Sequence, residues 1–305
     1  MDSDFSEGSF LQTVLPTFGV GNELQMGVSS PKRSQAYGLG RYAFAANAHL
    51  TEQHPLNSAA SAKQLLSEWG YYWNLSKPVL LEKTPTDMLT ARLLQALLSP
   101  PPRQQASFLF ITRHPLAVSL AHQRWPQCRR MSVASLALHW LVSHRQLAAD
   151  LPRLNSAATL RYEDLAREPA GCMRTLVAWL RLPAATLPAS RVAHDTNGKY
   201  ERRYCEEHLR SPRQRREHCA MGRALQPGVR ELGLGYDLEN GGPHGFSCLA
   251  EPPPTNVLPE PTPLACHKVP PAAALDRALK EHMAHLDSPE ERASSLGERL
   301  LCASG

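Results

Sequence analysis

Short apolar runs alternate with helical patterns from residue 78 onward, and this alternation restricts the fold more than any other feature of the chain. The runs PVLLEK (78–83), FLFIT (108–112) and ATLRYEDL (158–165) predict strands. Helices are predicted over 58–69, 87–98, the segment after FLFIT, 133–151 and 168–182. Successive strands joined through helices pair in parallel, so we predict an α/β fold in which helices flank a parallel sheet.

The body of this fold is predicted to end near residue 239. Residues 1 to about 60 mix short apolar pieces with glycine, serine and proline, which indicates a loop-rich start. After GLGYDL (233–238) the periodic apolar positions fade and prolines accumulate. We therefore expect one domain over 1–239, a proline-rich linker over 240–271 and a helical tail over 272–305.

Composition excludes several classes of protein. With 42% apolar residues the chain can build a core, and its net charge of +5 favours anionic ligands without requiring a nucleic acid or a membrane surface. The seven cysteines form no CxxC pair and no zinc-type spacing, so we expect no metal, and they leave the redox compartment open. No run approaches the roughly 20 apolar residues that cross a bilayer, and MDSDFSEG is acidic, so we expect neither an anchor nor an export signal in this chain.

Charged residues follow the predicted strands at the points where the strands end. Lys83 lies in LLEKTP, Arg113 in FITRHP and Glu163 in LRYEDL. The carboxyl ends of parallel strands meet at one edge of a sheet, where ligands usually bind. Arginine offers a planar charged fork to a phosphate, whereas lysine offers a point charge. The alternative for each residue is a solvated position in a loop.

The order and wording of these motifs resemble the sulfotransferase family. The resemblance runs from Glu7 to Leu238 and is carried by LEKTP, by FLFITRHP with the following AVS, by LRYEDL, by TNGKY and by LGYDL. It implies a P-loop-like α/β fold and the use of 3′-phosphoadenosine 5′-phosphosulfate (PAPS) as co-substrate. It also implies transfer of a sulfuryl group to a hydroxyl or amine of a carbohydrate or protein acceptor.

The resemblance assigns three residues to the nucleotide. Arg113 corresponds to the arginine that grips the 3′-phosphate, and Ser119 to its serine partner, although Ser119 follows the arginine by six residues where the family pattern has eight. The alternative for Ser119 is a helix residue that is hydrogen-bonded to its own preceding turn. Lys199 lies in TNGKY, which resembles a family segment near the cofactor. It is expected either to contact a phosphate or to remain an exposed loop lysine.

Two further residues are candidates for the chemistry. Lys83 resembles an active-site lysine near the transferred sulfuryl group, where a fixed cation stabilises charge that develops in the transition state. Glu7 is the first candidate for the base that accepts the acceptor's proton, with His49 and His54 as alternatives.

Glu163 and Asp164 are expected to orient the loop after their strand. The arginines between Arg202 and Arg216 either extend a positive edge or form a solvated helix face, and without interleaved aromatics they do not indicate nucleic-acid binding.

One motif of the family is missing from the sequence. The SGTT- or SGTS-type glycine loop that binds the 5′-phosphosulfate is not found, because FGVGNELQMG (18–27) lacks its hydroxyl and basic residues. SEGSFLQTVLP (6–16) resembles family sequence that follows this loop, so we expect an N-terminally incomplete fold. An inactive, nucleotide-binding or scaffold protein is the alternative function. The sequence leaves the cellular compartment open. The resemblance implies the Golgi if an N-terminal anchor is missing, and the cytoplasm is expected otherwise.

Overall fold

The computed structural model describes residues 7–16, 40–44, 48–77, 79–99, 106–126, 128–183 and 197–239. The predicted linker over 240–271, the predicted tail over 272–305 and the glycines of 18–27 lie outside the described residues. The described chain forms two compact units within the predicted 1–239 domain. The first unit contains the described residues up to Phe108 and Val142–Ala157, and the second contains Leu109–Leu141 and the described residues from Ala158 to Glu239.

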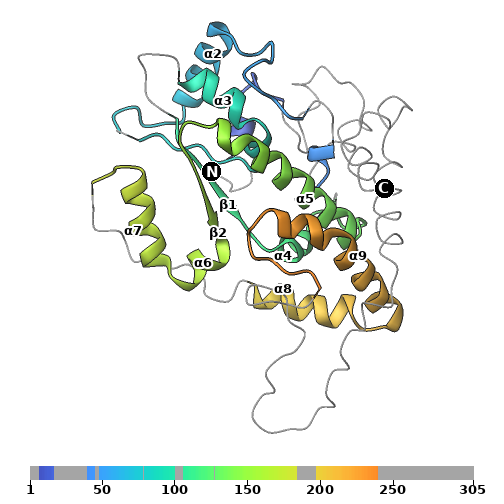
Figure 1. The fold of residues 1–305 in the computed structure, drawn as a ribbon. Coiled ribbons are helices and arrows are strands. Elements are labelled where there is room, and N and C mark those ends of the chain that lie inside the picture. Colours follow the sequence, from blue (N-terminus) through green and yellow to red (C-terminus); the bar gives the residue numbers. More distant parts are fainter. Residues whose placement is uncertain are drawn as a thin grey trace. The chain divides into compact units, whose positions relative to one another are not determined.

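A two-stranded parallel sheet confirms the predicted fold class (Figure 1). Strand β1 (Phe108–Thr112) pairs with β2 (Ala157–Arg161), and the connection between them contains α4 (Pro115–His122) and the long helix α5 (Val133–Asp150). Helices therefore join and flank the parallel strands, as the alternation in the sequence predicts. The short 3₁₀ helices are η2 (Gly8–Leu11), η3 (Tyr42–Phe44), η4 (Pro85–Leu89) and η5 (Leu151–Arg153).

Two details of the predicted strands are wrong. Residues 79–84 form no strand in the described chain, and Leu81 remains 81% exposed. An apolar run becomes a strand only where a neighbouring strand accepts its backbone hydrogen bonds, and no such ladder forms here. The strand predicted over 158–165 ends at Arg161, because Tyr162–Arg167 forms helix α6 with Glu163 and Asp164 in its first turn, where carboxylates are favourable.

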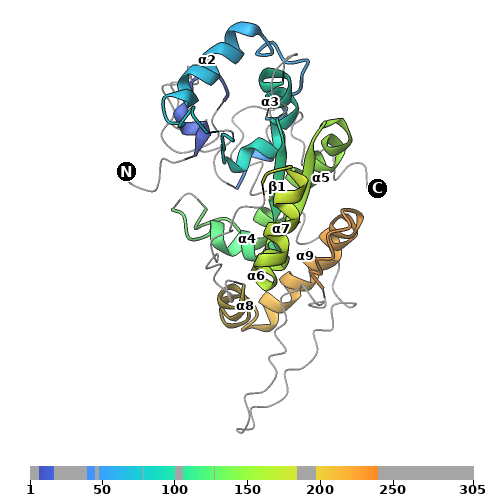
Figure 2. The same cartoon turned by 90° about the vertical axis from the view of Figure 1, so that its left-hand side faces the viewer.

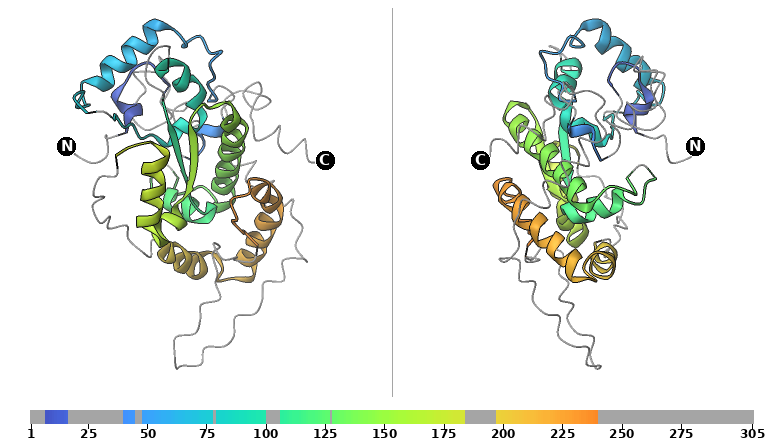
Figure 3. Two further views of the ribbon diagram at one scale, coloured as in Figure 1. Left: turned by 60° about the vertical axis from the view of Figure 1, so that its left-hand side comes forward. Right: turned by 90° about the vertical axis from the view of Figure 1, so that its right-hand side faces the viewer.

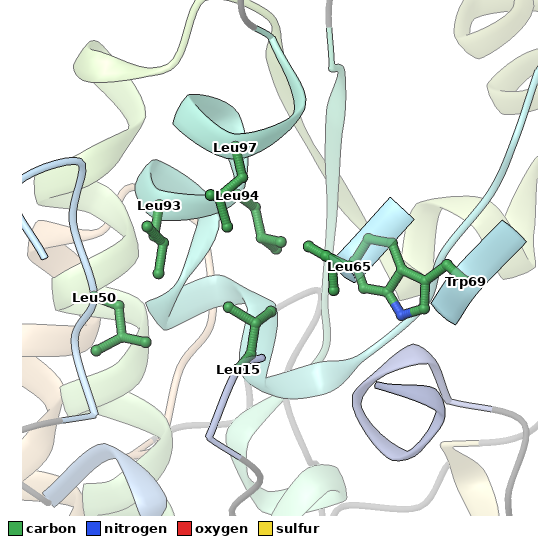
Figure 4. Packing of buried hydrophobic residues seen from close by; sticks show 7 residues of the cluster. All are labelled: Leu15, Leu50, Leu65, Trp69, Leu93, Leu94 and Leu97. Carbon is green, nitrogen blue, oxygen red and sulfur yellow. The ribbon is translucent and has the colours of Figure 1, made fainter. Parts of the chain in front are cut away.

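The first unit is built on helices α2 (Ala59–Gly70) and α3 (Ala91–Leu98). The hydroxyl of Ser58 caps α2 by accepting a hydrogen bond from the backbone N–H of Ser61. Figure 4 shows Leu65 of α2 and Leu94 of α3 turned toward one another in the core. The seven buried residues of this core are Leu15, Leu50, Leu65, Trp69, Leu93, Leu94 and Leu97.

Beyond α6, the described part of the second unit continues with four helical segments. Helix α7 spans Pro169–Trp179, α8 spans Gly198–Arg203, and a π-helical turn (Tyr204–His208) leads from α8 toward α9 (Pro212–Glu231), as Figure 3 shows. Helix α8 packs against α4 (Figure 2). Cys205 and Cys219 are each disulfide-bonded, whereas Cys128 and Cys172 are free thiols.

The chain that follows α9 turns back onto this helix at a glycine. A Cβ atom at Gly222 would lie 3.0 Å from the carbonyl oxygen of Leu238, so a larger residue would push the returning chain away. The side chain of Gln226 holds this chain by donating to the carbonyl of Tyr236 and accepting from the N–H of Leu238. Tyr236 is fixed in this way, and its hydroxyl takes part in the site described below. None of the helices in the described residues combines the length and apolar character needed to cross a membrane.

Candidate functional site

Arg113 lies at the junction between β1 and α4. Strand β1 ends at Thr112, and His114 caps α4 by accepting a hydrogen bond on Nδ1 from the N–H of Leu116 at 3.2 Å. The indole N–H of Trp140 donates to the carbonyl oxygen of Arg113 at 3.0 Å. The backbone of Arg113 is thus held between a strand end and a helix N-terminus.

The guanidinium of Arg113 is fixed by aromatic rings and one amide. Its Cζ lies 4.3 Å from the ring centroid of Tyr162 and 5.1 Å from that of Tyr200. Its Nε donates to Oδ1 of Asn197 at 2.8 Å. Its Nη2 is buried and has no hydrogen-bond partner within the described chain. A buried cationic donor without a partner is costly, so this atom is the natural point of attachment for an anion.

Glu163 is the centre of the hydrogen bonds around Arg113. Its Oε1 accepts from the backbone N–H of His114 at 2.9 Å and from Nδ2 of Asn197 at 2.8 Å. Its Oε2 accepts from the hydroxyl of Tyr236 at 2.9 Å. Burial raises the pKa of Tyr236 and lowers the pKa of His114 to about 4, so both groups are neutral near pH 7.

Lys199 contacts the same aromatic ring as Arg113, whereas Ser119 takes part in a different contact. The exposed Lys199 has its Nζ 4.9 Å from the ring centroid of Tyr200, so two cations lie against one aromatic ring. Ser119 is buried in α4, and its hydroxyl donates to the carbonyl of Pro115 at 2.8 Å. This is the arrangement of a helix residue bonded to its own preceding turn.

The first unit brings together the two residues predicted for the chemistry. Nζ of Lys83 lies 2.6 Å from Oε1 of Glu7. Two hydrogen bonds hold the segment of Glu7 in place: the indole N–H of Trp69 donates to the carbonyl of Gly8 at 2.9 Å, and the N–H of Ser9 donates to Oγ1 of Thr84 at 3.0 Å. A cation and a carboxylate that could accept a proton therefore lie side by side, with the lysine side chain 67% exposed.

The segment that carries Lys83 also carries two further acidic residues, Glu82 and Asp87. Thr84 donates to the carboxylate of Glu82. Burial raises the pKa of Asp87 well above its usual range, and a hydrogen bond with Glu82 and the negative charge of Glu82 add to this effect. Asp87 therefore prefers its neutral form more strongly than a free aspartate does. Within the residues that the structure describes, no group of three or more His, Cys, Asp or Glu side chains is arranged to hold a metal ion.

We expect Asp87→Asn to make the stability of the first unit less sensitive to rising pH. A carboxyl whose pKa is higher in the folded state contributes stability below its unfolded pKa, and this stability is lost as the pH rises through the folded pKa. Asparagine stays neutral and can still donate to Glu82. Urea unfolding measured from acidic to neutral pH tests the expectation, with the exposed carboxylate variant Glu206→Gln as control. Equal pH slopes in the parent and Asp87→Asn would contradict it.

The two alternative bases make structural contacts within the first unit. Nε2 of His49 lies 2.7 Å from Oδ2 of the buried Asp150, which Arg92 also contacts at 3.3 Å. His54 accepts a hydrogen bond on Nδ1 from the N–H of Leu56 at 3.2 Å. Within the residues that the structure describes, Lys83 pairs with Glu7 and with neither histidine.

Sequence reasoning missed most of the surroundings of Arg113. The ring of Tyr162 and the hydroxyl of Tyr236 were not among the predicted site residues, although both lie in the motifs LRYEDL and LGYDL. Glu163 was expected only to orient its loop. The two motifs place Tyr162 directly after a strand and Tyr236 shortly after a helix. A motif does not show which side chains contact one another in the fold.

Comparisons with known proteins agree with the motifs. A family model described as the sulfotransferase family matches residues 22–186, which is more than half of the 305 residues. The match contains Lys83, Arg113, Ser119 and Glu163, whereas Glu7 and Lys199 lie outside it. No curated protein matches the chain, and no solved structure matches it.

Proposed function

Since the chain belongs to the sulfotransferase family, we propose that it transfers a sulfuryl group from PAPS to a hydroxyl or amine of a carbohydrate or protein acceptor. The family match supports a sulfotransferase in general, and the donor and the acceptor class are the proposal. The observation that carries it is the buried Nη2 of Arg113, which has no partner within the described chain.

The surroundings of Arg113 support a phosphate as its ligand. Two cations, Arg113 and Lys199, lie 5.1 Å and 4.9 Å from the ring centroid of the same residue, Tyr200. Nε of Arg113 is already bonded to Asn197, so the outer edge of the fork is what remains for a ligand. We propose that Arg113 and Lys199 bind the 3′-phosphate of PAPS. A contact from Ser119 would require its hydroxyl to leave the carbonyl of Pro115.

The Lys83–Glu7 pair supports the transfer chemistry. PAPS supplies an activated sulfuryl group, and its transfer to a hydroxyl releases a proton. We propose that Glu7 accepts this proton on its carboxylate and that Lys83 stabilises negative charge that develops on oxygen. The ion pair at 2.6 Å keeps these two groups adjacent before an acceptor arrives.

Disulfide bonding at Cys205 and Cys219 bears on the proposed compartment. Cys205 and Cys219 are each disulfide-bonded, and such bonds persist mainly in oxidising compartments. This supports a Golgi-type lumenal site for the sulfation that we propose. Recovery of the protein from cells with both cysteines as free thiols would contradict it.

The first test is binding of 3′-phosphoadenosine 5′-phosphate, the nucleotide product. We expect the parent to bind it, and we expect Arg113→Ala to weaken binding by roughly 10- to 100-fold, because charge-assisted hydrogen bonds contribute about 1.5–3 kcal/mol. Titration calorimetry measures both affinities. Adenosine 5′-phosphate, which lacks the 3′-phosphate, should bind the parent and Arg113→Ala alike.

Two controls separate this result from a loss of fold. Arg113→Lys keeps the charge but not the fork, and Arg216→Ala removes an exposed arginine on α9. Arg216→Ala should bind as the parent does. A parent that fails to bind the product would contradict the nucleotide proposal. Binding without transfer would favour the second candidate, an inactive nucleotide-binding protein.

A further inference from the structure

The carboxylate of Glu163 is hydrogen-bonded to groups that surround Arg113 and, in the described part of the chain, forms no hydrogen bond or ion pair with Arg113 itself. It accepts from the N–H of His114, from the amide of Asn197 and from the hydroxyl of Tyr236, all between 2.8 and 2.9 Å. These three donors come from the start of α4, the start of α8 and the chain after α9. One carboxylate therefore ties together three segments that are distant in sequence.

The contact with Asn197 has a direction. An ionised carboxylate only accepts hydrogen bonds, so the amide of Asn197 must turn its NH₂ group toward Glu163. The amide oxygen then points the other way and accepts from Nε of Arg113 at 2.8 Å. Glu163, which accepts from the amide NH₂, and Nε of Arg113, which can only donate, together fix the Asn197 amide with its oxygen toward the arginine.

This direction matters for the part of Arg113 that is left free for a ligand. With Nε bonded to Asn197 and the ring faces of Tyr162 and Tyr200 against the guanidinium, the plane of the fork is set. The buried Nη2 is then the donor without a partner within the described chain. A direct Glu163–Arg113 ion pair would have used this donor, and the intervening amide avoids it.

We propose that Glu163 is a positioning residue that acts through Asn197 to hold the Arg113 guanidinium ready for the 3′-phosphate. The proposal deepens the proposed function and rests on it. A purely structural role for Glu163, as an acceptor for the first N–H groups of α4, predicts an effect on stability alone. A positioning role predicts an effect on recognition of the 3′-phosphate.

The test compares the parent with Glu163→Gln, Asn197→Ala and the control Arg216→Ala, which removes an exposed arginine from α9. Glu163→Gln keeps the shape of the side chain but removes its charge, so the hydrogen bond that holds the Asn197 amide is weakened. Asn197→Ala breaks the same connection without touching α4.

We expect Glu163→Gln and Asn197→Ala each to weaken binding of 3′-phosphoadenosine 5′-phosphate by roughly tenfold, as loss of one charge-assisted hydrogen bond would. The double variant should lose little more than either single variant, because both break one connection. Binding of adenosine 5′-phosphate should not change, and the control Arg216→Ala should bind as the parent does. Equal affinities in the parent and Glu163→Gln would overturn the proposal, as would equal losses for both nucleotides.

A second readout does not depend on the nucleotide. The Nε–H signal of Arg113, identified in NMR spectra by its absence in Arg113→Lys, should exchange faster with solvent in Glu163→Gln and Asn197→Ala than in the parent. If the parent binds no nucleotide but this signal responds, the proposed function fails and the positioning of Arg113 by Glu163 stands. An unchanged signal in both variants would overturn the positioning role even where the nucleotide binds.

Discussion

Replacing Lys83 by alanine is expected to lower the rate of sulfuryl transfer from labelled PAPS by roughly 10²- to 10³-fold, the loss typical when one stabilising charge is removed from a transition state. The same change should barely alter the free energy of unfolding. The lysine side chain is 67% exposed, and exposed ion pairs such as Lys83–Glu7 contribute only about 0–1 kcal/mol. A large effect on rate with almost none on stability would identify Lys83 as part of the chemistry.

The matched control is Lys63→Ala, which removes an exposed lysine from α2 in the same unit. It should leave both rate and stability unchanged. Lys83→Arg retains a positive charge and should keep part of the rate. Glu7→Gln can no longer accept a proton, so its transfer rate should fall and should vary with pH differently from that of the parent. Full transfer by Lys83→Ala would show that the Lys83–Glu7 pair is only a surface ion pair.

The fold could be predicted wherever a local pattern was sufficient. FLFIT gave β1 over Phe108–Thr112, and the periodicity of 133–151 gave α5 over Val133–Asp150. PVLLEK has the same apolar character as FLFIT but forms no strand in the described chain. A strand needs a partner for its backbone hydrogen bonds, and the presence of a partner is not a property of the run itself.

The candidate site likewise contains residues that a local sequence pattern predicts and contacts that no local pattern predicts. Arg113 was predictable, because a strand end followed by a proline-started helix is a local feature. The Glu163–Tyr236 hydrogen bond joins residues 73 positions apart and depends on how α9 and the returning chain fold. The Lys83–Glu7 pair joins residues 76 positions apart; the position of Lys83 after an apolar run indicated the lysine, but only the resemblance to a family suggested Glu7. Long-range contacts between polar groups leave no periodic signal in a sequence.

The second unit is expected to unfold as the pH falls from 6.5 toward about 4. Burial lowers the pKa of His114, His122 and His218 to about 4 in each case. A histidine with a depressed pKa contributes stability that is fully present above its unfolded pKa of 6.5 and is lost as the pH falls through the folded value. Each shift corresponds to roughly 3 kcal/mol, and three such losses are comparable to the 5–15 kcal/mol that stabilise a typical domain.

His122 offers the sharpest test of this acid sensitivity. Its Nδ1 is buried without a hydrogen-bond partner within the described chain, whereas His114 caps α4 and His218 contacts the hydroxyl of Tyr204. His122→Leu therefore removes a titrating group without removing a hydrogen bond, and it should shift the acid midpoint of unfolding to lower pH. Circular dichroism and urea titrations between pH 6.5 and about 4 measure this shift.

His54→Leu is the control for a histidine of the first unit that is only partly buried. It should leave the acid midpoint of the second unit unchanged. An unchanged midpoint in His122→Leu would mean that His122 is not buried as a neutral group in solution. Because the raised pKa of Asp87 makes the first unit lose stability as pH rises, while the three histidines make the second lose stability as pH falls, the two units should respond to pH in opposite directions.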